Sequence, residues 1–557
     1  MAAVTFDKYL RPHEVEQALH AFAEAHPGLC AVASIGTSHE GRPILCATLT
    51  NSETGPDTEK PAFWLDANIH ATEVTGCMGA LHLIQTALER YGSDPRVTAL
   101  LDTRALYVVP CLNPDGMEQA LTSPVYVRSG TRRYPYADER DGLYPEDIDG
   151  DGLIVDMRIE DPDGGWKVSE KDPRLMRRRG PDEVGGTYYR VYTEGSVRGY
   201  DGFELKVAPP AQGLDFNRNF PYIWAPEGEQ HGAGPFPASE PEVRATVAFL
   251  SAHLNVSCAL SYHTFSGVLL RPYSDKPDDK MAQDDVWTFK EIGERGKALT
   301  GYPHVSVYHG FRYHPREVMN GAFDDWAYDQ LGIYAFTVEL WDMVGEAGIK
   351  ERDFIEWFRD HPEEDDLKLL KWNDEVLGGK GFVNWRPFEH PQLGKVEIGG
   401  WIERRTFGNP PEQLLPQTVA PSTEFALAHA LMTPRLELRQ ASAEALGDGL
   451  YRVRAVVANS GYLPTYGSKR AQEVRAVRPI EVTLTLPDGA ELLTGEARQE
   501  IGQLEGRANK RGLWGGDYPT DNLRKLEWTV RAPAGGAVRV AAASQRAGAA
   551  RAELTLE

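Results

Sequence analysis

Two histidines and two carboxylates, each placed at the end of an apolar run, are the residues best suited to chemistry in this sequence. His70 and Glu73 stand three residues apart after the run AFWLD, a spacing that places two side chains on one face of a first helical turn. Three other His–Glu pairs share this spacing, so spacing alone is a weak signal. His70 and Glu73 differ in following a predicted buried strand, where open α/β sheets bind their ligands. They are either two ligands of one metal ion or a surface ion pair.

His263, in SYHTFSG, and Glu339, in FTVELW, end two further apolar runs. A catalytic zinc site needs a third protein ligand and an open position for water. His263 suits that role, although a lone histidine in such a place is more often a core residue. A carboxylate such as Glu339 beside a metal-activated water suits general-base chemistry, and its alternative is a buried acid paired with an arginine. Asn217 and Arg218, in GLDFNRNF, offer donors for binding a carboxylate.

The elements that position these residues follow from the periodicity of the first 380 residues. Short apolar runs bounded by Pro, Asn or Gly predict strands, and apolar residues at helical spacing predict helices between them. The strands are 62–66, 105–109, 259–262 and 333–340, and the helices are 76–91, 240–250 and 286–299. This alternation predicts an α/β sheet covered on both faces.

Two parts of the chain depart from that pattern. Residues 125–210 are rich in Arg, Asp, Gly and Tyr with weak periodicity, and a loop of that length is functional or has structure of its own. In the last third, the segments 451–457, 480–486, 526–530 and 552–556 alternate apolar and polar residues between short turns. Strands with one wet face predict a β-sandwich.

Composition excludes several classes of function. The 557 residues carry 59 Lys and Arg against 82 Asp and Glu, a formal charge of −23, whereas nucleic acids and anionic membranes demand a basic surface. The five cysteines are widely spaced without a CxxC pair, which argues against a thiolate zinc site or a disulfide framework. The sequence shows no signal-peptide pattern and no run of 18 apolar residues, so we expect a cytoplasmic protein without membrane insertion.

Six segments, in order, resemble the zinc carboxypeptidase family, the carboxypeptidase A-like enzymes. They are PAFWLDANIHATE (61–73), LNPDG (112–116), GLDFNRNF (213–220), ASEPE (238–242), SYHTFSGVLLRPY (261–273) and DDWAYDQLGIYAFTVEL (324–340). The resemblance implies an α/β fold with a mixed, mostly parallel sheet flanked by helices. The catalytic domain would span 1–382 with an atypical insertion at about 125–210. Outside the resemblance, the sequence pattern predicts a connecting segment at 383–430 and an immunoglobulin-like C-terminal β-sandwich at 431–557.

The resemblance also implies the metal chemistry. His70, Glu73 and His263 would bind one Zn²⁺ per chain, with water in the fourth position. Glu339 would deprotonate that water and pass the proton to the leaving amine. Asp215 would accept a hydrogen bond from the nitrogen of His70 that does not bind metal.

Substrate contacts are implied in the same way. Asn217 and Arg218 would bind the terminal carboxylate of a peptide, which makes the enzyme an exopeptidase. The family stabilises its oxyanion with an arginine, a role that Arg128 would fill by its distance from LNPDG. Arg178 or Arg179 is the alternative, because the atypical segment follows Arg128 directly.

Two positions depart from the family pattern. Where the family commonly has a tyrosine that closes over the substrate, this chain has Glu317, and Tyr308 or Tyr313 would need a shifted loop. Asp324 matches a position that lines the side-chain pocket, where an acid favours a C-terminal Lys or Arg. The alternative is that Asp324 turns outward or caps the following helix.

The segment DIDGDGL has the first half of a calcium-binding loop, with Asp147, Asp149 and Asp151 at positions one, three and five. Position twelve is Arg158 rather than Glu, so Asp156 or another acid would have to complete the site. A Ca²⁺ site and a simple Asp/Gly turn both fit this pattern.

These observations predict a zinc-dependent metallocarboxypeptidase whose partner is a peptide with a free C-terminal carboxylate. One alternative is an amidohydrolase or deacylase that acts on cell-wall peptides or N-acyl amino acids with the same site. An alternative of another class is a non-catalytic zinc-containing protein whose β-sandwich binds a carbohydrate or a protein. The sequence does not identify the partner of the β-sandwich.

Overall fold

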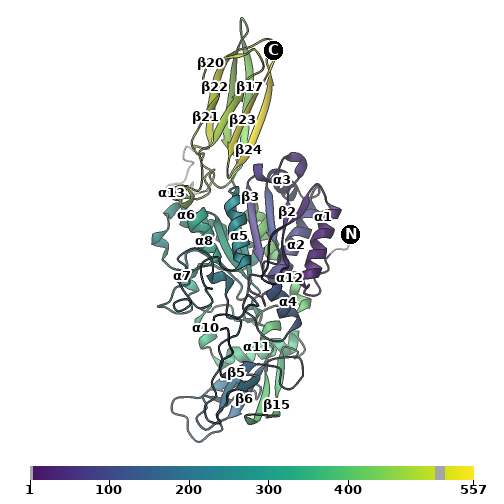
Figure 1. Cartoon of the computed structure of the whole chain (residues 1–557), viewed down its shortest axis with the longest axis vertical. Coiled ribbons are helices and arrows are strands. Elements are labelled where there is room, and N and C mark those ends of the chain that lie inside the picture. Colours follow the sequence, from purple (N-terminus) through teal and green to yellow (C-terminus); the bar gives the residue numbers. More distant parts are fainter. Residues whose placement is uncertain (1–3, 509–520) are drawn as a thin grey trace.

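The computed structural model describes residues 4–508 and 521–557 and has three parts stacked along its long axis (Figure 1). An α/β part occupies the middle. A β-sandwich made by the C-terminal residues stands above it, and a smaller β-rich part that includes β5, β6 and β15 lies below it.

The middle part is built on an eight-stranded mixed sheet. The central strands β4, β3, β11 and β14 run parallel, and antiparallel pairs join β1 to β2, β2 to β4 and β12 to β14. In spatial order the strands are β1 (Cys30–Thr37), β2 (Pro43–Leu49), β4 (Ala105–Val109), β3 (Ala62–Ala67), β11 (Val256–Thr264), β14 (Tyr334–Leu340), β12 (Val268–Arg271) and β13 (His304–Ser306). Every residue of β3, β4, β11 and β14 is buried, which explains why β3, β4 and β14 are mainly apolar rather than alternating.

Helices cover both faces of this sheet. On one face, α2 (Val74–Arg90), α6 (Gln283–Thr300) and α12 (Leu415–Leu431) pack together and against the strands. On the other face, Phe249 of α5 (Pro241–Ala252) packs on Trp64 of β3, and α8 (Phe323–Leu331) packs on β14. The remaining longer helices of the described α/β part are α1 (Pro12–Ala25), α3 (Pro95–Thr103), α4 (Pro114–Thr122) and α11 (Glu363–Val376).

The insertion and the segment after residue 382 fold together. A six-stranded sheet joins β15 (Phe382–His390), β16 (Gly394–Trp401), β6 (Asp156–Glu160), β9 (Tyr189–Thr193), β7 (Trp166–Val168) and β8 (Met176–Arg178) in that order. A two-stranded sheet of β5 (Gly142–Pro145) and β10 (Gly195–Arg198) shares an apolar core with it. The sequence predicts a connecting segment at 383–430, whereas the structure gives it a hairpin in this sheet and helix α12 against the α/β sheet. Apolar side chains on both elements, such as Ile398 and Phe425, are buried in these contacts.

The C-terminal part consists of two four-stranded antiparallel sheets that enclose one apolar core. The first sheet contains β17 (Leu436–Gly447), β18 (Leu450–Asn459), β22 (Leu523–Arg531) and β20 (Glu491–Thr494). The second contains β21 (Arg498–Glu500), β19 (Glu481–Thr485), β23 (Ala537–Ser544) and β24 (Gly548–Thr555). Along β18 the residues alternate between buried and partly exposed up to Val457, as the period-two pattern predicts.

The β-sandwich docks on the edge of the α/β sheet where the parallel strands begin. The fully buried guanidinium of Arg546 donates to the carbonyl oxygen of Val256 at 2.9 Å and to that of Leu331. Asp285 of α6 accepts hydrogen bonds from the backbone of α13 (Lys469–Glu473). Because the carboxyl ends of the strands lie at the opposite edge, the sandwich is remote from the residues that end β11 and β14.

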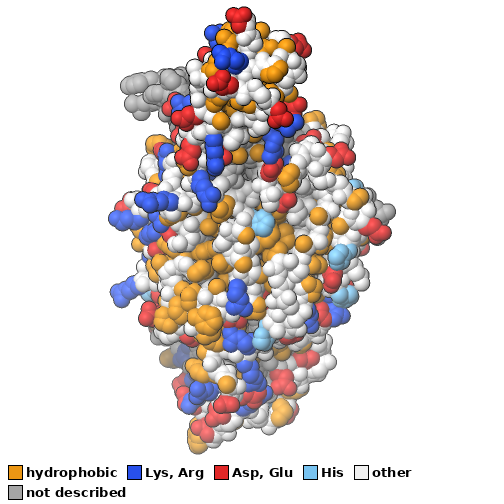
Figure 2. Space-filling model, turned by 45° about the horizontal axis from the view of Figure 1, so that its top comes forward, with side chains coloured by type: hydrophobic (Ala, Val, Ile, Leu, Met, Phe, Trp, Pro, Cys, Tyr) orange, Lys and Arg blue, Asp and Glu red, His pale blue; other side chains and the backbone are white. Residues whose placement is uncertain are grey.

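On the face drawn in Figure 2, acidic and basic side chains are interspersed on the sandwich at the top of the view. Pairs such as Arg454–Glu527 and Arg539–Glu553 link neighbouring strands on its outer surfaces. In the part of the chain that the structure describes, no helix combines the length and the apolar character that a membrane crossing requires.

Candidate active site

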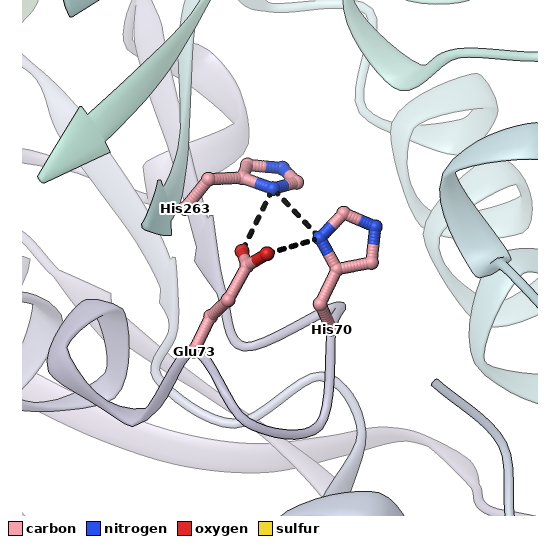
Figure 3. A group of neighbouring side chains, drawn as sticks. All are labelled: His70, Glu73 and His263. Atoms are coloured by element: carbon pink, nitrogen blue, oxygen red, sulfur yellow. Dashed lines mark hydrogen bonds and ion pairs between the residues drawn. The ribbon is translucent and has the colours of Figure 1, made fainter. Parts of the chain in front are cut away.

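His70, Glu73 and His263 converge at the carboxyl edge of the sheet, with their polar atoms directed toward one another (Figure 3). The Nδ1 atom of His70 lies 2.8 Å from Glu73 Oε1 and 3.0 Å from His263 Nδ1, and His263 Nδ1 lies 3.0 Å from Glu73 Oε2. The three residues are only 1–6% exposed. Burial alone would raise the pKa of Glu73, but the adjacent His70 and His263 hold it well below its usual range.

Local backbone structure explains how residues 193 positions apart meet. β3 and β11 are parallel neighbours, so His263 on β11 and the loop after β3 lie at the same edge of the sheet. The sequence predicts His70 and Glu73 on a first helical turn, but the structure places them in a turn closed by a Glu73 N to His70 O hydrogen bond of 3.2 Å. Glu73 is the N-cap of α2 and has non-helical backbone angles, so the turn rather than the helix brings the two side chains together.

The donor set fits a zinc ion. Two imidazole nitrogens and a carboxylate are a common protein ligand set for catalytic zinc and leave one coordination position open. At bond lengths of about 2.0–2.2 Å and tetrahedral angles, ligand atoms lie about 3.3 Å apart, a few tenths of an ångström more than the separations found here. His70 directs its other nitrogen, Nε2, at Asp215 Oδ1 at 3.0 Å, which leaves Nδ1 as its metal-binding atom.

Arg128 and Asp215 enclose the cluster on its outer side. Arg128 contacts Glu73 Oε1 through Nη1 at 3.0 Å and Asp215 Oδ2 through Nε at 3.1 Å. Burial alone would raise the pKa of Asp215, but Arg128, Arg218 and His70 hold it well below its usual range. Burial opposes the charge of Arg128 as well, yet Asp215 and Glu73 keep its pKa well above the ordinary value. The guanidinium is therefore charged and fixed beside the metal-ligand cluster.

Glu339 comes from the neighbouring strand at the same level as His263. The parallel register of β11 and β14 pairs His263 with Glu339, so both side chains project from the same face of adjacent strands. Glu339 is 9% exposed, and its Oε2 atom has no hydrogen-bond partner among the described residues. Burial and the nearby Glu73 raise the pKa of Glu339 well above its ordinary value, against the effect of Arg128.

Asn217, Arg218 and Asp324 form one polar group beside Glu339. Asn217 and Arg218 lie in the 3₁₀ turn η3 (Phe216–Arg218), whose start is capped by Asp215. The Asn217 side chain accepts a hydrogen bond of 2.8 Å from the backbone of Phe323, next to Asp324 at the start of α8. Asp324 is 3% exposed, so it does not turn outward. Burial raises the pKa of Asp324 to about 6, and Arg218 opposes this shift.

The LNPDG segment acts as a scaffold for the site. Asn113 donates to the carbonyl oxygens of Ile69 and Ser129, the residues next to His70 and Arg128. Gly116 packs closely against both the loop of His70 and the loop of Arg128. A side chain at this position would collide with Ala71 in the first loop and with the Ser129 carbonyl group in the second. The two loops that carry the cluster are thus joined through residues 113–116.

Two residues next to the cluster were not predicted from the sequence. Ser261 Oγ lies 3.2 Å from His263 Nε2 and donates a hydrogen bond of 2.6 Å to Asp66. Burial raises the pKa of Asp66 to about 6, while its hydrogen bonds from Ser261 and Trp64 oppose the shift. Their signal in the sequence was their position. Asp66 lies near the end of the strand that precedes His70, and Ser261 precedes His263 by two residues on one strand.

The structure also places the arginines that are alternatives to Arg128 and the candidates for a tyrosine that closes over the substrate. Arg178 lies over the ring of Trp166, and Arg179 lies over the ring of Tyr188, both within the insertion. Tyr308 stacks with Arg312, and Glu317 is exposed. Tyr313, which is 47% exposed, lies near enough to Arg128 to affect the pKa of its guanidinium.

Asp147, Asp149 and Asp151 lie together in the insertion, with one oxygen of each within 4.8 Å of the others. Arg386 of β15 contacts both Asp149 and Asp151, the latter at 2.6 Å, and so supplies a positive charge at the loop. Asp147 accepts hydrogen bonds from the backbone of residues 150 and 152. Arg158 pairs with Glu397 at 2.8 Å rather than with this loop. A calcium ion here stays a prediction.

Comparisons with known proteins place most of the chain in two families. A family model described as zinc carboxypeptidase matches residues 15–349, and a model described as a domain of unknown function (DUF8731) matches residues 435–555. Carboxypeptidase A6 of Mus musculus is 25% identical over 351 residues, which are 61% of this chain and 62% of that protein. Carboxypeptidase A2 of Rattus norvegicus is 26% identical over 381 residues, 64% of this chain and 72% of that protein.

A crystal structure of thrombin activatable fibrinolysis inhibitor aligns with 77% of this chain and 75% of its own at 18% identity and a TM-score of 0.43. The chain spans 62% of the length of carboxypeptidase A6 and 72% of carboxypeptidase A2. The zinc carboxypeptidase match covers more than half of the 557 residues and includes all the residues of the cluster. The chain belongs to the zinc carboxypeptidase family.

Proposed function

We propose that this protein is a zinc-dependent metallocarboxypeptidase that hydrolyses the C-terminal peptide bond of peptides. The observation that carries the proposal is the convergence of His70, Glu73 and His263 on one point, with Arg128 against Glu73. Membership of the zinc carboxypeptidase family supports the same metal and the same reaction.

In this proposal, His70, Glu73 and His263 hold the zinc ion. When bound, zinc polarises the scissile carbonyl group and lowers the pKa of a water molecule. Glu339, buried at the same level as His263, takes the proton from the attacking water and delivers it to the leaving nitrogen. Arg128 donates to the oxygen that gains negative charge during the attack.

Arg218 and Asn217 select a substrate with a free terminal carboxylate. Both side chains are buried, and a guanidinium binds a carboxylate more strongly than a neutral donor does. Asp324 supports a preference for a C-terminal Lys or Arg, because the charge of its buried carboxylate attracts a basic side chain. The substrate is therefore proposed to be a peptide that ends in a basic residue.

The test is a substrate panel run on protein of measured zinc content. We expect about one zinc per chain and hydrolysis of acylated dipeptides with a free carboxylate, but little hydrolysis of the same dipeptides with an amidated C-terminus. A chelator should abolish the activity, and added zinc should restore it. Preferential hydrolysis of N-acyl amino acids or cell-wall peptides would contradict the proposal, as would bound zinc without hydrolysis of any tested amide.

A further inference from the structure

His263 has two ring nitrogens in different surroundings. Its Nδ1 atom faces His70 and Glu73 at 3.0 Å, whereas its Nε2 atom lies 3.2 Å from the hydroxyl of Ser261. A neutral imidazole carries its proton on only one nitrogen. Zinc binding through Nδ1 requires the proton on Nε2, so the group that faces Nε2 decides how well His263 is prepared for the metal.

The hydroxyl of Ser261 faces Nε2 with its lone pairs. Ser261 donates its single proton to Asp66 Oδ1 at 2.6 Å, and the other oxygen of Asp66 accepts a hydrogen bond of 2.6 Å from Trp64 Nε1. Asp66 thus receives two donors, and the hydroxyl is left as an acceptor toward His263. Trp64, Asp66, Ser261 and His263 therefore form a row of hydrogen-bonded side chains, in which each hydrogen bond requires the orientation of the next.

Strand pairing holds the row in place. Ser261 and His263 lie two residues apart on β11, and Trp64 and Asp66 lie two residues apart on β3, so each pair projects from one face of its strand. The parallel register places Ser261 beside Asp66. All four side chains are at most 1% exposed, so water does not compete for their hydrogen bonds.

We propose that Ser261 and Asp66 are positioning residues that fix the tautomer and ring orientation of His263 for zinc binding. This inference rests on the proposed function, because it requires His263 to be a zinc ligand. It gives His263 an indirect carboxylate contact through a hydroxyl, whereas His70 contacts Asp215 directly. If the row served only the packing of the core, its loss would lower stability without changing zinc affinity.

Asp66→Asn separates these two roles. An amide of the same shape has one acceptor oxygen, but Ser261 and Trp64 both donate to this position. If the oxygen turns to Trp64, the amide donates to Ser261, the hydroxyl then donates to His263, and the proton of His263 is forced onto Nδ1. Adding Trp64→Phe removes the competing donor and lets the amide oxygen face Ser261 again.

The experiment measures zinc affinity by competition with a chromophoric chelator and records the visible spectrum of the Co²⁺ form. We expect zinc affinity to fall about 10–100-fold in Ser261→Ala and in Asp66→Asn, with an altered Co²⁺ spectrum. Ser257→Ala, a buried serine at the far end of β11, is the matched control and should bind zinc as the wild type does. The double variant Asp66→Asn/Trp64→Phe should bind zinc several-fold more tightly than Asp66→Asn alone.

Wild-type zinc affinity in both Ser261→Ala and Asp66→Asn overturns the inference, and so does a double variant no tighter than Asp66→Asn. If Ser261→Ala does not fold, as judged by thermal unfolding of the metal-free protein, the Asp66 comparison decides alone. Zinc binding by the wild type and by His263→Ala is measured in parallel. Equal affinity of these two would refute the proposed metal site itself, which separates that failure from a failure of the positioning row.

Discussion

Replacing Asp324 by asparagine should remove a preference for C-terminal lysine and arginine while making the protein more stable at neutral pH. Asp324 lies in the first turn of α8 and is 3% exposed. One carboxylate oxygen accepts a hydrogen bond of 3.0 Å from the backbone of Asp325, and the other has no partner among the described residues. The free protein therefore keeps a buried negative charge that a basic substrate side chain would neutralise.

The effect on specificity follows from Coulomb's law. Two unit charges about 4 Å apart at an effective dielectric constant of about 20 attract by about 4 kcal/mol. If desolvation of the substrate cation cancels half of this, about 2 kcal/mol remains, or roughly a 30-fold preference in kcat/KM. Asp324→Asn keeps the shape of the side chain but removes the charge, so we expect the ratio of kcat/KM for Arg over Leu substrates to fall by about that factor.

The same substitution should increase the stability of the protein. Burial raises the pKa of Asp324 from 3.8 to about 6, so between these pH values the folded state binds more protons than the unfolded state. Stability therefore falls as the pH rises through this window, and the cost is complete above pH 6. This rise of the pKa to about 6 corresponds to about 3 kcal/mol. Asp324→Asn should raise the free energy of unfolding at pH 7.5 by up to that amount.

The assay compares acylated dipeptides that end in Arg, Lys, Leu and Phe, together with urea unfolding at pH 5 and pH 7.5. Asp325→Asn is the matched control for specificity, because its carboxylate is already bound by hydrogen bonds from the backbone of Ser274. An unchanged Arg-to-Leu ratio in Asp324→Asn would refute the pocket assignment. A loss of stability at pH 7.5 would refute the claim that the buried charge is costly.

Three further substitutions test separate parts of the site and fold. Glu339→Gln should keep one zinc per chain and lower kcat by at least about 100-fold, and turnover near the wild-type rate would show that Glu339 is not the base. Arg218→Ala should lower kcat/KM about 10–100-fold on peptides with a free carboxylate and leave the slow hydrolysis of amidated peptides unchanged, so equal losses contradict its role. Arg546→Ala should lower the free energy of unfolding by about 3 kcal/mol, because two buried carbonyl groups lose their donor, while kcat/KM stays the same. If Arg546→Ala has the same free energy of unfolding as the wild type, this interpretation of the interface is wrong.

Local pattern predicted the four fully buried central strands of the α/β sheet, but not its other strands β1, β2, β12 and β13. The strand predicted at 105–109 has these same bounds in β4, and the strand predicted at 62–66 is one residue longer in β3. Such strands are recognised because full burial on both faces requires a continuous apolar run between turn residues. His70, His263 and Glu339 were identified individually for the same reason, since each lies at the end of such a run.

The local pattern could not predict contacts between residues that are far apart in the sequence. Hydrophobic periodicity does not report which strands pair, so the pairing of β16 with β6, about 240 residues earlier, left no signal. The turn at residues 70–73 also escaped prediction, because its geometry depends on the position of Glu73 as a helix cap rather than on periodicity. The contacts of Arg128 with Glu73 and Asp215 belong to the same class.

The two accessory parts lie at opposite edges of the catalytic sheet, and this gives them different influence on the reaction. The insertion leaves the α/β part just after Arg128 and returns just before Asp215, so both of its ends carry residues that contact the metal-ligand cluster. The sandwich contacts Val256, seven residues before His263 on β11, and at about 3.3 Å per residue this is about 23 Å away. A movement of the insertion therefore acts on Arg128 and Asp215 directly. A change in the sandwich reaches them only indirectly, through the buried strand β11 and the helices α6 and α8 that the sandwich contacts, so we expect it to alter stability before it alters catalysis.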